Sequence, residues 1–553
     1  MKVKSPKVFI FSFLFIQMIC LVGHAQNQEI DFSSSNLAIL IIDTHGEEII
    51  DQRRIPADLQ IIHNGSGKRN YLTDSTFHYD GEIGIELRGS TSQEWPKKPY
   101  RFETHDSLGG DQNVSLLGMP AENDWILHNP WSDKTLMRNI LTYKIANDMG
   151  RYASRTRLCE VWLNGQYTGV YVLMEKLKRD KNRVDIAALD SADVAGDDLT
   201  GGYIIKIDKT DGEQIGGWRS AKRTNYQYHY PKPDDILDVQ KEYIKNFMDA
   251  FERIIDSPGY ADPDTGYAKY LNIDAFVDFC IINEISKNVD GYRLSTFMYK
   301  DRDSKGGLLT LGPVWDFNLA FANSYYYDGA RVENWNIETL FQRTKGDYPP
   351  PFWMEIIWND ATFRSRFTER WRALRQNVLQ TDALLNYIDA VADTLDEAQR
   401  RNFLVWPILG QYVWPNFFIG DSWEEEIEHL KEWTEARFAW IDENVEKLHA
   451  MTTLAMDNQP PAAYVLEQNF PNPFNPVTTI QYSSAVHSHI TLKVYNSLGQ
   501  EVKTVLDEFQ SPGRRSVIWD GTDHFGVRVP SGVYTYQLRV ATQTLTRKML
   551  LIQ

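Results

Sequence analysis

The chain contains 553 residues, of which 42% are hydrophobic and 24% are charged, a composition typical of a packed soluble protein with about two to four domains. A disordered chain and a collagen-like fibre are both excluded by this composition. The 58 basic and 75 acidic residues give a formal net charge of −17, which argues against a general nucleic-acid binder, because such proteins carry basic patches.

The N-terminus has the pattern of a secretory signal. Three lysines within the first seven residues precede an apolar run over residues 8–22, and small residues flank His24. This pattern predicts cleavage after Ala25 and removal of residues 1–25. The apolar run is shorter than the ~20 residues that a membrane-spanning helix needs, and we expect no transmembrane span in the rest of the chain.

Cleavage would leave two cysteines, Cys159 and Cys280. In an oxidising compartment they could form one disulfide. Both lie in apolar runs, residues 158–163 and 276–282, and this favours the alternative of two buried free thiols.

The first half of the mature chain is predicted to begin with β-strands. Alternating or β-branched apolar runs predict strands at 37–42, 59–63, 82–88 and 100–103. Asp133 is expected to cap a helix that continues to Met149 and ends at Gly150. The Asn164-Gly165 pair predicts a hairpin between strands 158–163 and 168–174.

The second half is predicted to be mostly helical before the composition changes. Residues 190–235 are polar and rich in glycine, and predict a loop or hairpin region. Helical patterns occupy about 236–257, 272–288, 361–378, 380–402 and 424–448. We therefore assign residues 26–455 to one catalytic-type domain.

A linker composition over residues 456–463 separates this domain from a different C-terminal part. Short alternating runs at 478–482, 491–495, 516–519 and 533–538 are divided by Gly, Pro and Asn turns. Residues 464–553 are thus predicted to form a small all-β, Ig-like sandwich.

Two aspartates flank the most informative segment. Asp290 ends a helical pattern, strands are predicted at 296–299 and 308–311, and Asp316 follows them. A hairpin returns its ends to the same edge, so both carboxylates can share one site. Phosphoryl transfer uses such a pair, one to orient the attacking hydroxyl and one to hold a divalent metal. The alternative is purely structural, with Asp290 capping a turn and Asp316 ending a strand.

The chain order matches that of a protein kinase. Lys97 and Lys98 lead a strand, a helix follows, and the hairpin over 158–174 ends near Glu175. The turn that begins at Arg88 is a candidate phosphate-contacting turn, and a plain hairpin is the alternative.

The sequence also resembles the CotH kinase family of atypical secreted kinases, over about residues 80–330 and in the family's order. The matching motifs include Arg-Gly-Ser-Thr at 88–91, Pro-Lys-Lys-Pro-Tyr-Arg at 96–101, Asp-Trp-Ile-Leu at 124–127, Ser-Asp-Lys at 132–134 with Arg-Asn at 138–139, Glu-Val-Trp-Leu-Asn-Gly at 160–165, Met-Glu-Lys at 174–176, Gly-Gly-Tyr at 201–203, Asn-Val-Asp-Gly-Tyr at 288–292 and Gly-Pro-Val-Trp-Asp-Phe at 312–317.

The resemblance implies an α+β, atypical kinase-like two-lobed domain that binds ATP with Mg²⁺ or Mn²⁺. It implies phosphorylation of Ser or Thr in extracytoplasmic proteins, with Asp290 catalytic and Asp316 a metal ligand. Asn318 is the candidate second metal ligand, with Asn288 as an alternative. The nucleotide-binding candidates are Arg88, Lys97, Lys98, Arg138 and Glu175.

The sequence departs from a typical kinase at two places. Ser295 occupies the position, five residues after the catalytic Asp, where kinases carry a metal-binding Asn. The helix over 133–149 contains no Glu that could pair with a nucleotide-binding Lys. These departures keep a second hypothesis open, namely a non-catalytic, pseudokinase surface protein involved in adhesion or associated with the cell envelope.

The C-terminal part resembles a type IX secretion sorting domain. The resemblance is carried by Asn-Phe-Pro-Asn-Pro-Phe-Asn-Pro at 469–476, Tyr-Asn-Ser-Leu-Gly-Gln at 495–500, Trp-Asp-Gly at 519–521, Ser-Gly-Val-Tyr at 531–534 and Lys-Met-Leu-Leu at 548–551. It implies recognition by the type IX secretion machinery and delivery to the cell surface or the medium. An Ig-like spacer or binding module is the alternative.

Overall fold

The computed structural model describes residues 30, 32–209, 216–344, 347–456, 464–484, 486, 488–510, 513–540 and 543–552. The expected signal segment, residues 1–25, and residues 457–463 of the expected linker lie outside this part of the chain. Within it, no helix has both the length and the apolar character needed to cross a membrane.

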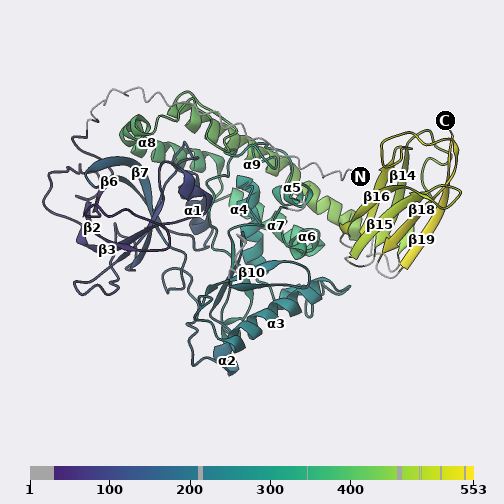
Figure 1. The fold of residues 1–553 in the computed structure, drawn as a ribbon, viewed down its shortest axis with the longest axis horizontal. Coiled ribbons are helices and arrows are strands. Elements are labelled where there is room, and N and C mark those ends of the chain that lie inside the picture. The colour runs from purple at the N-terminus through teal and green to yellow at the C-terminus, as the bar shows by residue number, and fades with distance from the viewer. Residues whose placement is uncertain are drawn as a thin grey trace, which may run out of the picture.

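The N-terminal part is a closed seven-stranded barrel with the strand order β1-β2-β3-β4-β5-β7-β6 (Figure 1, purple to blue). β1 and β6 close it by parallel pairing, and the other neighbours are antiparallel. The strands are β1 (Ala38–Asp43), β2 (Ile55–Ile62), β3 (Tyr79–Leu87), β4 (Tyr100–Thr104), β5 (Asp124–His128), β6 (Thr156–Leu163) and β7 (Gln166–Glu175).

Side chains at every second strand position fill the interior of the barrel. Ala38, Leu40 and Ile42 alternate along β1 and are buried with the alternate residues of the next strands, as expected when one face of each strand points inward. The β6–β7 turn uses Asn164 and Gly165, both at positive φ, so the predicted hairpin is confirmed.

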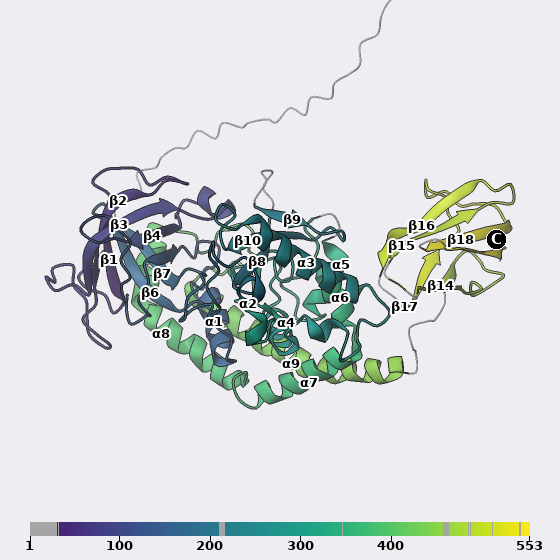
Figure 2. The ribbon, with the colours of Figure 1, turned by 90° about the horizontal axis from the view of Figure 1, so that it is seen from below.

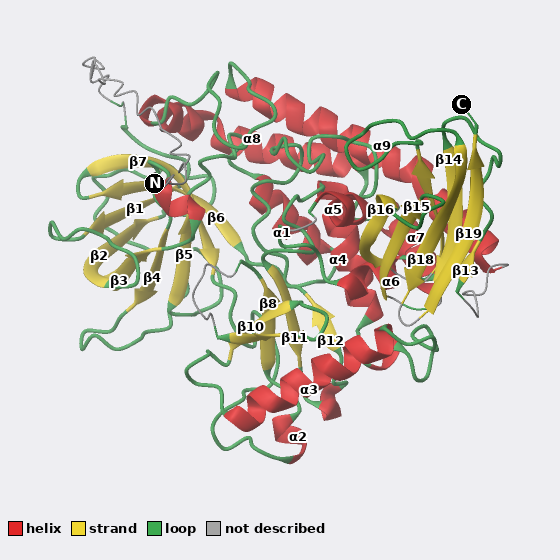
Figure 3. Cartoon of the chain, turned by 45° about the vertical axis from the view of Figure 1, so that its right-hand side comes forward, coloured by secondary structure: helices red, strands yellow, loops and turns green. Residues whose placement is uncertain are grey.

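A second, five-stranded sheet with the order β12-β11-β8-β10-β9 follows in the chain. Its strands are β8 (Tyr203–Ile207), β9 (Gly217–Arg219), β10 (Asn225–Tyr230), β11 (Thr296–Lys300) and β12 (Leu309–Leu311). Figure 3 shows this sheet beside the barrel, with helices packed around it. The prediction of a loop or hairpin region over 190–235 missed β8, which lies inside the sheet between β11 and β10.

The helices surround this sheet and extend over the barrel. The chain forms α1 (Arg138–Asp148), α2 (Gly196–Leu199), α3 (Asp238–Ile255), α4 (Ile273–Ser286), α5 (Asn336–Arg343), α6 (Phe352–Trp358), α7 (Ala361–Arg375), α8 (Thr381–Val405) and α9 (Trp423–Met456). Figure 2 shows α7, α8 and α9 running along one side of the molecule, and α8 packs against β7 of the barrel.

The helix predicted to begin after Asp133 begins five residues later, at Arg138. Asp133 does not act as the N-cap. Its carboxylate instead accepts hydrogen bonds from the backbone N–H groups of Thr135 and Arg138. These bonds close a turn in which Leu136 has a φ of 65°, and that conformation is incompatible with a helix.

Helix α4 leads directly to Asp290 and is fixed by a buried ion pair. Glu284 on α4 and Arg437 on α9 are both fully buried, with Nη2 of Arg437 3.3 Å from Oε2 of Glu284. Glu284 also accepts hydrogen bonds from the backbone N–H groups of Asn336 and Ile337 at the start of α5. The pair thus ties together the three helices behind the Asp290 loop.

We expect Arg437→Met to destabilise the protein by about 3–5 kcal/mol, because it leaves the buried Glu284 carboxylate without its counter-charge. The measurement is chemical denaturation followed by circular dichroism. Arg372→Met is the matched control, since Arg372 on α7 forms an exposed pair with Glu446 and exposed pairs contribute little. Equal losses in the two variants would contradict the prediction.

The C-terminal part is a two-sheet sandwich, as predicted. One sheet has the order β13-β14-β17 and the other β16-β15-β18-β19. The strands are β13 (Val465–Leu466), β14 (Thr478–Ser484), β15 (Ser488–Tyr495), β16 (Glu501–Gln510), β17 (Gly513–Trp519), β18 (Gly532–Val540) and β19 (Gln543–Leu551). Ile480, Trp519 and Tyr536 belong to its own buried core, which is separate from the cores of the preceding parts.

Candidate active site

Asp316 follows β12 and is held in place by helix α1. Its backbone N–H donates to the hydroxyl of Tyr143 at 3.2 Å, and the N–H of Phe317 donates to Oδ1 of Asn139 at 2.7 Å. Asp316 has a φ of 64°, a left-handed conformation that a non-glycine residue adopts at a cost and that is frequent at functional sites. The two hydrogen bonds from α1 hold this conformation.

The Asp316 carboxyl group has a perturbed acidity. The residue is reached by solvent, but the protein packed around its carboxylate desolvates it and raises its pKa to about 6. The negative charges of Asp290 and Asp208 raise the pKa further, whereas Arg88 and Lys209 lower it. Asp316 is therefore surrounded by charges of both signs, as is common at catalytic and metal-binding positions.

Asp290 lies in the loop after α4 and is oriented by Arg293. Nη1 of the buried Arg293 lies 3.0 Å from Oδ1 of Asp290. The same guanidinium donates to the carbonyl oxygens of Asp347 and Tyr348, which fixes it in the loop. One carboxylate oxygen of Asp290 is thus tethered, and the hairpin β11–β12 brings the residue within electrostatic reach of Asp316.

Asp208 is a third carboxylate at this site, and no sequence motif predicted it. It directly follows β8, forms an ion pair of 2.8 Å with Lys206 and accepts a long hydrogen bond of 3.5 Å from the N–H of Ser295. The sequence does contain a strand signal here, since Tyr203–Ile207 is a short β-like run that Asp208 directly follows. Because the surrounding residues are polar and rich in glycine, this run was not predicted to be a strand.

Arg88, which directly follows β3, is the predicted nucleotide-binding cation that interacts electrostatically with Asp316. Its guanidinium lies over the Trp315 ring, 5.7 Å from the ring centre, and the charge of Asp316 acts on it. Desolvation lowers the pKa of Arg88, and an arginine stays charged at neutral pH even so. The structure therefore brings together Arg88, Asp290 and Asp316 from the predicted set.

A basic pocket of about 600 Å³ lies on the adjoining barrel surface. Its lining includes Arg53, Arg54, Glu86, Arg101 and Lys176. Arg101 acts electrostatically on Arg88, so the pocket and the acidic group are neighbours. Its volume is in the range of pockets that bind small molecules. Each of its four named cations also pairs with a carboxylate, of Glu47, Glu86, Glu103 or Asp124.

The two lysines of the Lys-Lys-Pro motif, unlike Arg88, have their ammonium groups bound to oxygen atoms of the protein. Lys97 is 1% exposed, and its ammonium donates to the carbonyl oxygen of Val170 and, at 2.8 Å, to Oδ1 of Asn402. Burial lowers its pKa to about 7. Lys98 is half-buried and donates to the carbonyl oxygen of Gln93.

We therefore expect Lys97→Ala to lower stability and leave nucleotide affinity nearly unchanged. The substitution removes two hydrogen bonds of a buried ammonium, to Val170 on β7 and to Asn402 on α8, although Oδ1 of Asn402 still accepts from the N–H of Val170. The expected loss is about 1–3 kcal/mol. Thermal unfolding measures the first effect and titration with ATP and Mg²⁺ the second. A large loss of nucleotide affinity in a folded variant would restore Lys97 as a phosphate ligand.

Three other predicted site residues have structural partners. Arg138 is buried and donates to Asp133 and to the carbonyl oxygen of Phe321. Glu175 is fully buried and accepts hydrogen bonds from Arg155 and Tyr152. Asn318 directs its amide group to the hydroxyl of Ser132 at 3.4 Å. It lies two residues beyond Asp316, and its role as a metal ligand stays a prediction.

The acidic residues fit a metal that also binds phosphates. Mg²⁺ is usually held by one or two carboxylates, with water and substrate phosphates as its other ligands. Asp316, Asp290 and Asp208 are near enough to influence one another's charge, but they do not form a tight cage of three ligand atoms within 4.8 Å among the described residues.

Residues 85–441 match the family model described as CotH kinase protein. The chain belongs to this family, because the match covers more than half of its length, and a kinase-like function is thereby supported. Residues 476–544 match the model of the FlgD Ig-like domain, in agreement with the two-sheet sandwich. No curated protein matches the chain.

Three solved structures each match between 13% and 17% of the chain. Latent PorU from Porphyromonas gingivalis is 21% identical over 16% of this chain and 10% of its own, with a TM-score of 0.15. PorZ, a surface component of the type IX secretion system of the same organism, is 18% identical over 17% and 12%, with a TM-score of 0.13. FlgD from Pseudomonas aeruginosa is 24% identical over 13% and 57%, with a TM-score of 0.12. The chain thus spans about a tenth of the length of the first two.

Proposed function

We propose that this chain is an exported kinase that transfers the terminal phosphoryl group of ATP to a Ser or Thr hydroxyl of an extracytoplasmic protein. The observation that carries the proposal is that Asp290 and Asp316 lie on either side of the β11–β12 hairpin. Asp290 and Arg88 both act electrostatically on Asp316. Membership of the CotH kinase family supports it.

Each residue has a distinct role in this proposal. Asp316 and Asp208 would hold Mg²⁺ or Mn²⁺, with Asn318 as the further oxygen ligand that the sequence suggested. Arg88 would contact the phosphates, and Arg101 and Arg54 in the basic pocket would bind the remainder of the nucleotide. The bound metal ion neutralises phosphate charge and orients the terminal group for in-line attack.

Asp290 would act on the acceptor. Oδ1 is fixed by Arg293, which leaves Oδ2 to accept a hydrogen bond from the acceptor hydroxyl. As the new oxygen–phosphorus bond forms and the bond to the departing ADP breaks, the hydroxyl proton passes to the Asp290 carboxylate. Positioning and electrostatic stabilisation, rather than covalent chemistry, supply most of the acceleration in such reactions.

The test is incubation of the full chain with labelled ATP and Mg²⁺ or Mn²⁺, first alone and then with extracytoplasmic protein extracts, with mapping of any labelled residue. Thermal stabilisation by ATP and metal is measured in parallel, since a ligand that binds only the folded state raises its melting temperature. Stabilisation without any transfer would favour the pseudokinase alternative, which Ser295 supports. If ATP and metal neither stabilise the protein nor lead to phosphoryl transfer, the proposed nucleotide site is refuted.

We also propose that residues 464–553 direct the protein through the type IX secretion machinery. The motifs at 469–476 and 548–551 support this, and the sandwich has its own core. Deletion of residues 464–553 should leave the remaining chain in the periplasm, as measured by cell fractionation and immunoblotting. Delivery of the truncated chain to the surface at the parent level would remove the sorting role.

A further inference from the structure

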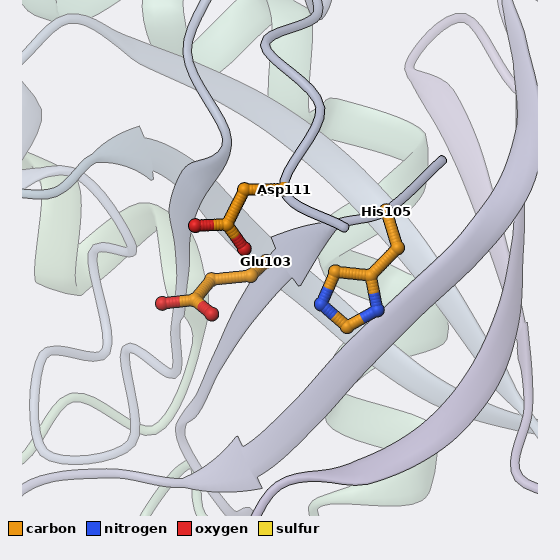
Figure 4. Close-up of side chains that lie close together, drawn as sticks. All are labelled: Glu103, His105 and Asp111. Carbon is orange, nitrogen blue, oxygen red and sulfur yellow. The ribbon is translucent and has the colours of Figure 1, made fainter. Parts of the chain in front are cut away.

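Three side chains with metal-binding atoms meet on the barrel, apart from the aspartates of the candidate active site. They are Glu103, His105 and Asp111, and one ligand atom of each lies within 4.8 Å of the others. Figure 4 shows Glu103 and His105 projecting from the end of β4 and its continuation, with Asp111 reaching across from the returning loop. Neither the family match nor the proposed kinase mechanism uses these residues.

The backbone brings the three side chains to one face. Glu103 and His105 are two residues apart on an extended segment and therefore point to the same side. Asp111 forms an antiparallel bridge directly opposite His105, and opposite residues in such a bridge share a face. The arrangement follows from strand register and does not depend on flexible side chains reaching towards one another.

Gly84 on the neighbouring strand β3 makes room for the imidazole. A Cβ atom at this position would lie 2.8 Å from Cε1 and 3.3 Å from Nε2 of His105, so a side chain there would displace the ring. Gly84 is also the cross-strand partner of Glu103. A glycine inside a strand is unfavourable by itself and often marks a place where another group approaches closely.

Other charged groups lie around the three residues. Arg54 contacts Glu103 at 2.5 Å and Lys176 contacts Asp124 at 2.8 Å. Lys178 also contacts Asp124 at 2.8 Å, so Asp124 pairs with two lysines and Glu103 with Arg54.

We propose that Glu103, His105 and Asp111 bind a first-row divalent metal ion, with Zn²⁺ as the best match, and that the ion clamps the 106–110 turn to strand β4. One imidazole and two carboxylates are borderline-hard N and O donors, which Zn²⁺ accepts readily. Ca²⁺ and Mg²⁺ prefer sets made of oxygen alone. Three protein ligands leave the remaining coordination position to water.

The test is titration of the tag-free full chain with Zn²⁺ in competition with a chromophoric chelator. We expect about one tight site per chain. His105→Gln and Asp111→Asn should each weaken it at least ~10-fold, the size of loss that even an outer-shell change can produce. Co²⁺ substitution adds a spectroscopic readout, since the visible absorption of the bound ion should change when the imidazole is removed.

Two control variants make the result specific. His45→Gln removes another barrel histidine beside carboxylates, but its Nδ1 faces Asp43 and its Nε2 faces Asp58, so those groups cannot converge on one ion. Asp316→Asn removes the proposed catalytic metal ligand. Both variants should keep the tight Zn²⁺ site. Equal Zn²⁺ affinity in His105→Gln and the parent, or loss of the site in Asp316→Asn instead, would overturn the proposal.

Discussion

Asp316→Asn should abolish phosphoryl transfer and weaken the binding of ATP in the presence of Mg²⁺. The substitution preserves the size of the side chain and the two hydrogen bonds that α1 makes to this segment, but it removes the negative charge that would bind the metal. An electrostatic group in such a site commonly contributes ~10²–10³ in rate. The measurements are ATP affinity by calorimetry, transfer of labelled phosphate, and circular dichroism as the folding control.

Asp264→Asn is the matched control for this variant, because Asp264 is an exposed aspartate in a turn outside the acidic group. It should bind ATP and transfer phosphate as the parent does. If Asp316→Asn binds ATP and metal as tightly as the parent, Asp316 is not a metal ligand.

The raised pKa of Asp316 gives this prediction a pH dependence. Its folded-state pKa of about 6 lies above the ordinary value of 3.8, so the folded state holds the proton more tightly than the unfolded state. The corresponding contribution to stability is fully present below about pH 4 and is lost as the pH rises through about 6. Metal affinity should change in the opposite direction and rise over the same interval as the carboxylate ionises. In Asp316→Asn both of these dependences should be smaller.

Asp290→Asn should reduce phosphoryl transfer by ~10²–10³ and leave the binding of ATP with metal nearly intact. Asparagine can still meet Arg293 through its Oδ1, but it cannot accept the proton of the acceptor hydroxyl. Single-turnover transfer separates the chemical step from product release. Transfer at the parent rate would mean that the catalytic loop has been misplaced and would leave the kinase proposal without its central residue.

The same variant also tests whether the two aspartates share a site. The charge of Asp290 is the second cause of the raised pKa of Asp316, after desolvation. Its removal should therefore move the pH midpoint of metal binding to a lower value. An unchanged midpoint would show that the two carboxylates do not influence each other.

The sequence predicted the local elements well where one physical signal dominated. Apolar runs with β-branched residues located β1 and β2, period-two runs located β3 and β4, and Asn164-Gly165 located the β6–β7 hairpin. Five helical patterns correspond to α3, α4, α7, α8 and α9. Sequence patterns failed to predict the local structure where local preferences competed with tertiary contacts. Asp133 resembles an N-cap, yet its carboxylate closes a turn ahead of α1, and β8 is hidden in a polar region that the neighbouring strands β10 and β11 stabilise.

By itself the sequence determined the all-β character of the C-terminal part, the hairpin between Asp290 and Asp316, and the family resemblance. Only the tertiary structure decided which charged residues can face a ligand. Lys97 points to Val170 and Asn402, 73 and 305 residues away along the chain, whereas Arg88 and Asp208 approach Asp316. Barrel closure through β1 and β6 is equally non-local. The reason is physical: periodicity fixes the face on which a side chain lies, but its charge, burial and partners depend on segments that are distant in sequence and meet only in the folded chain.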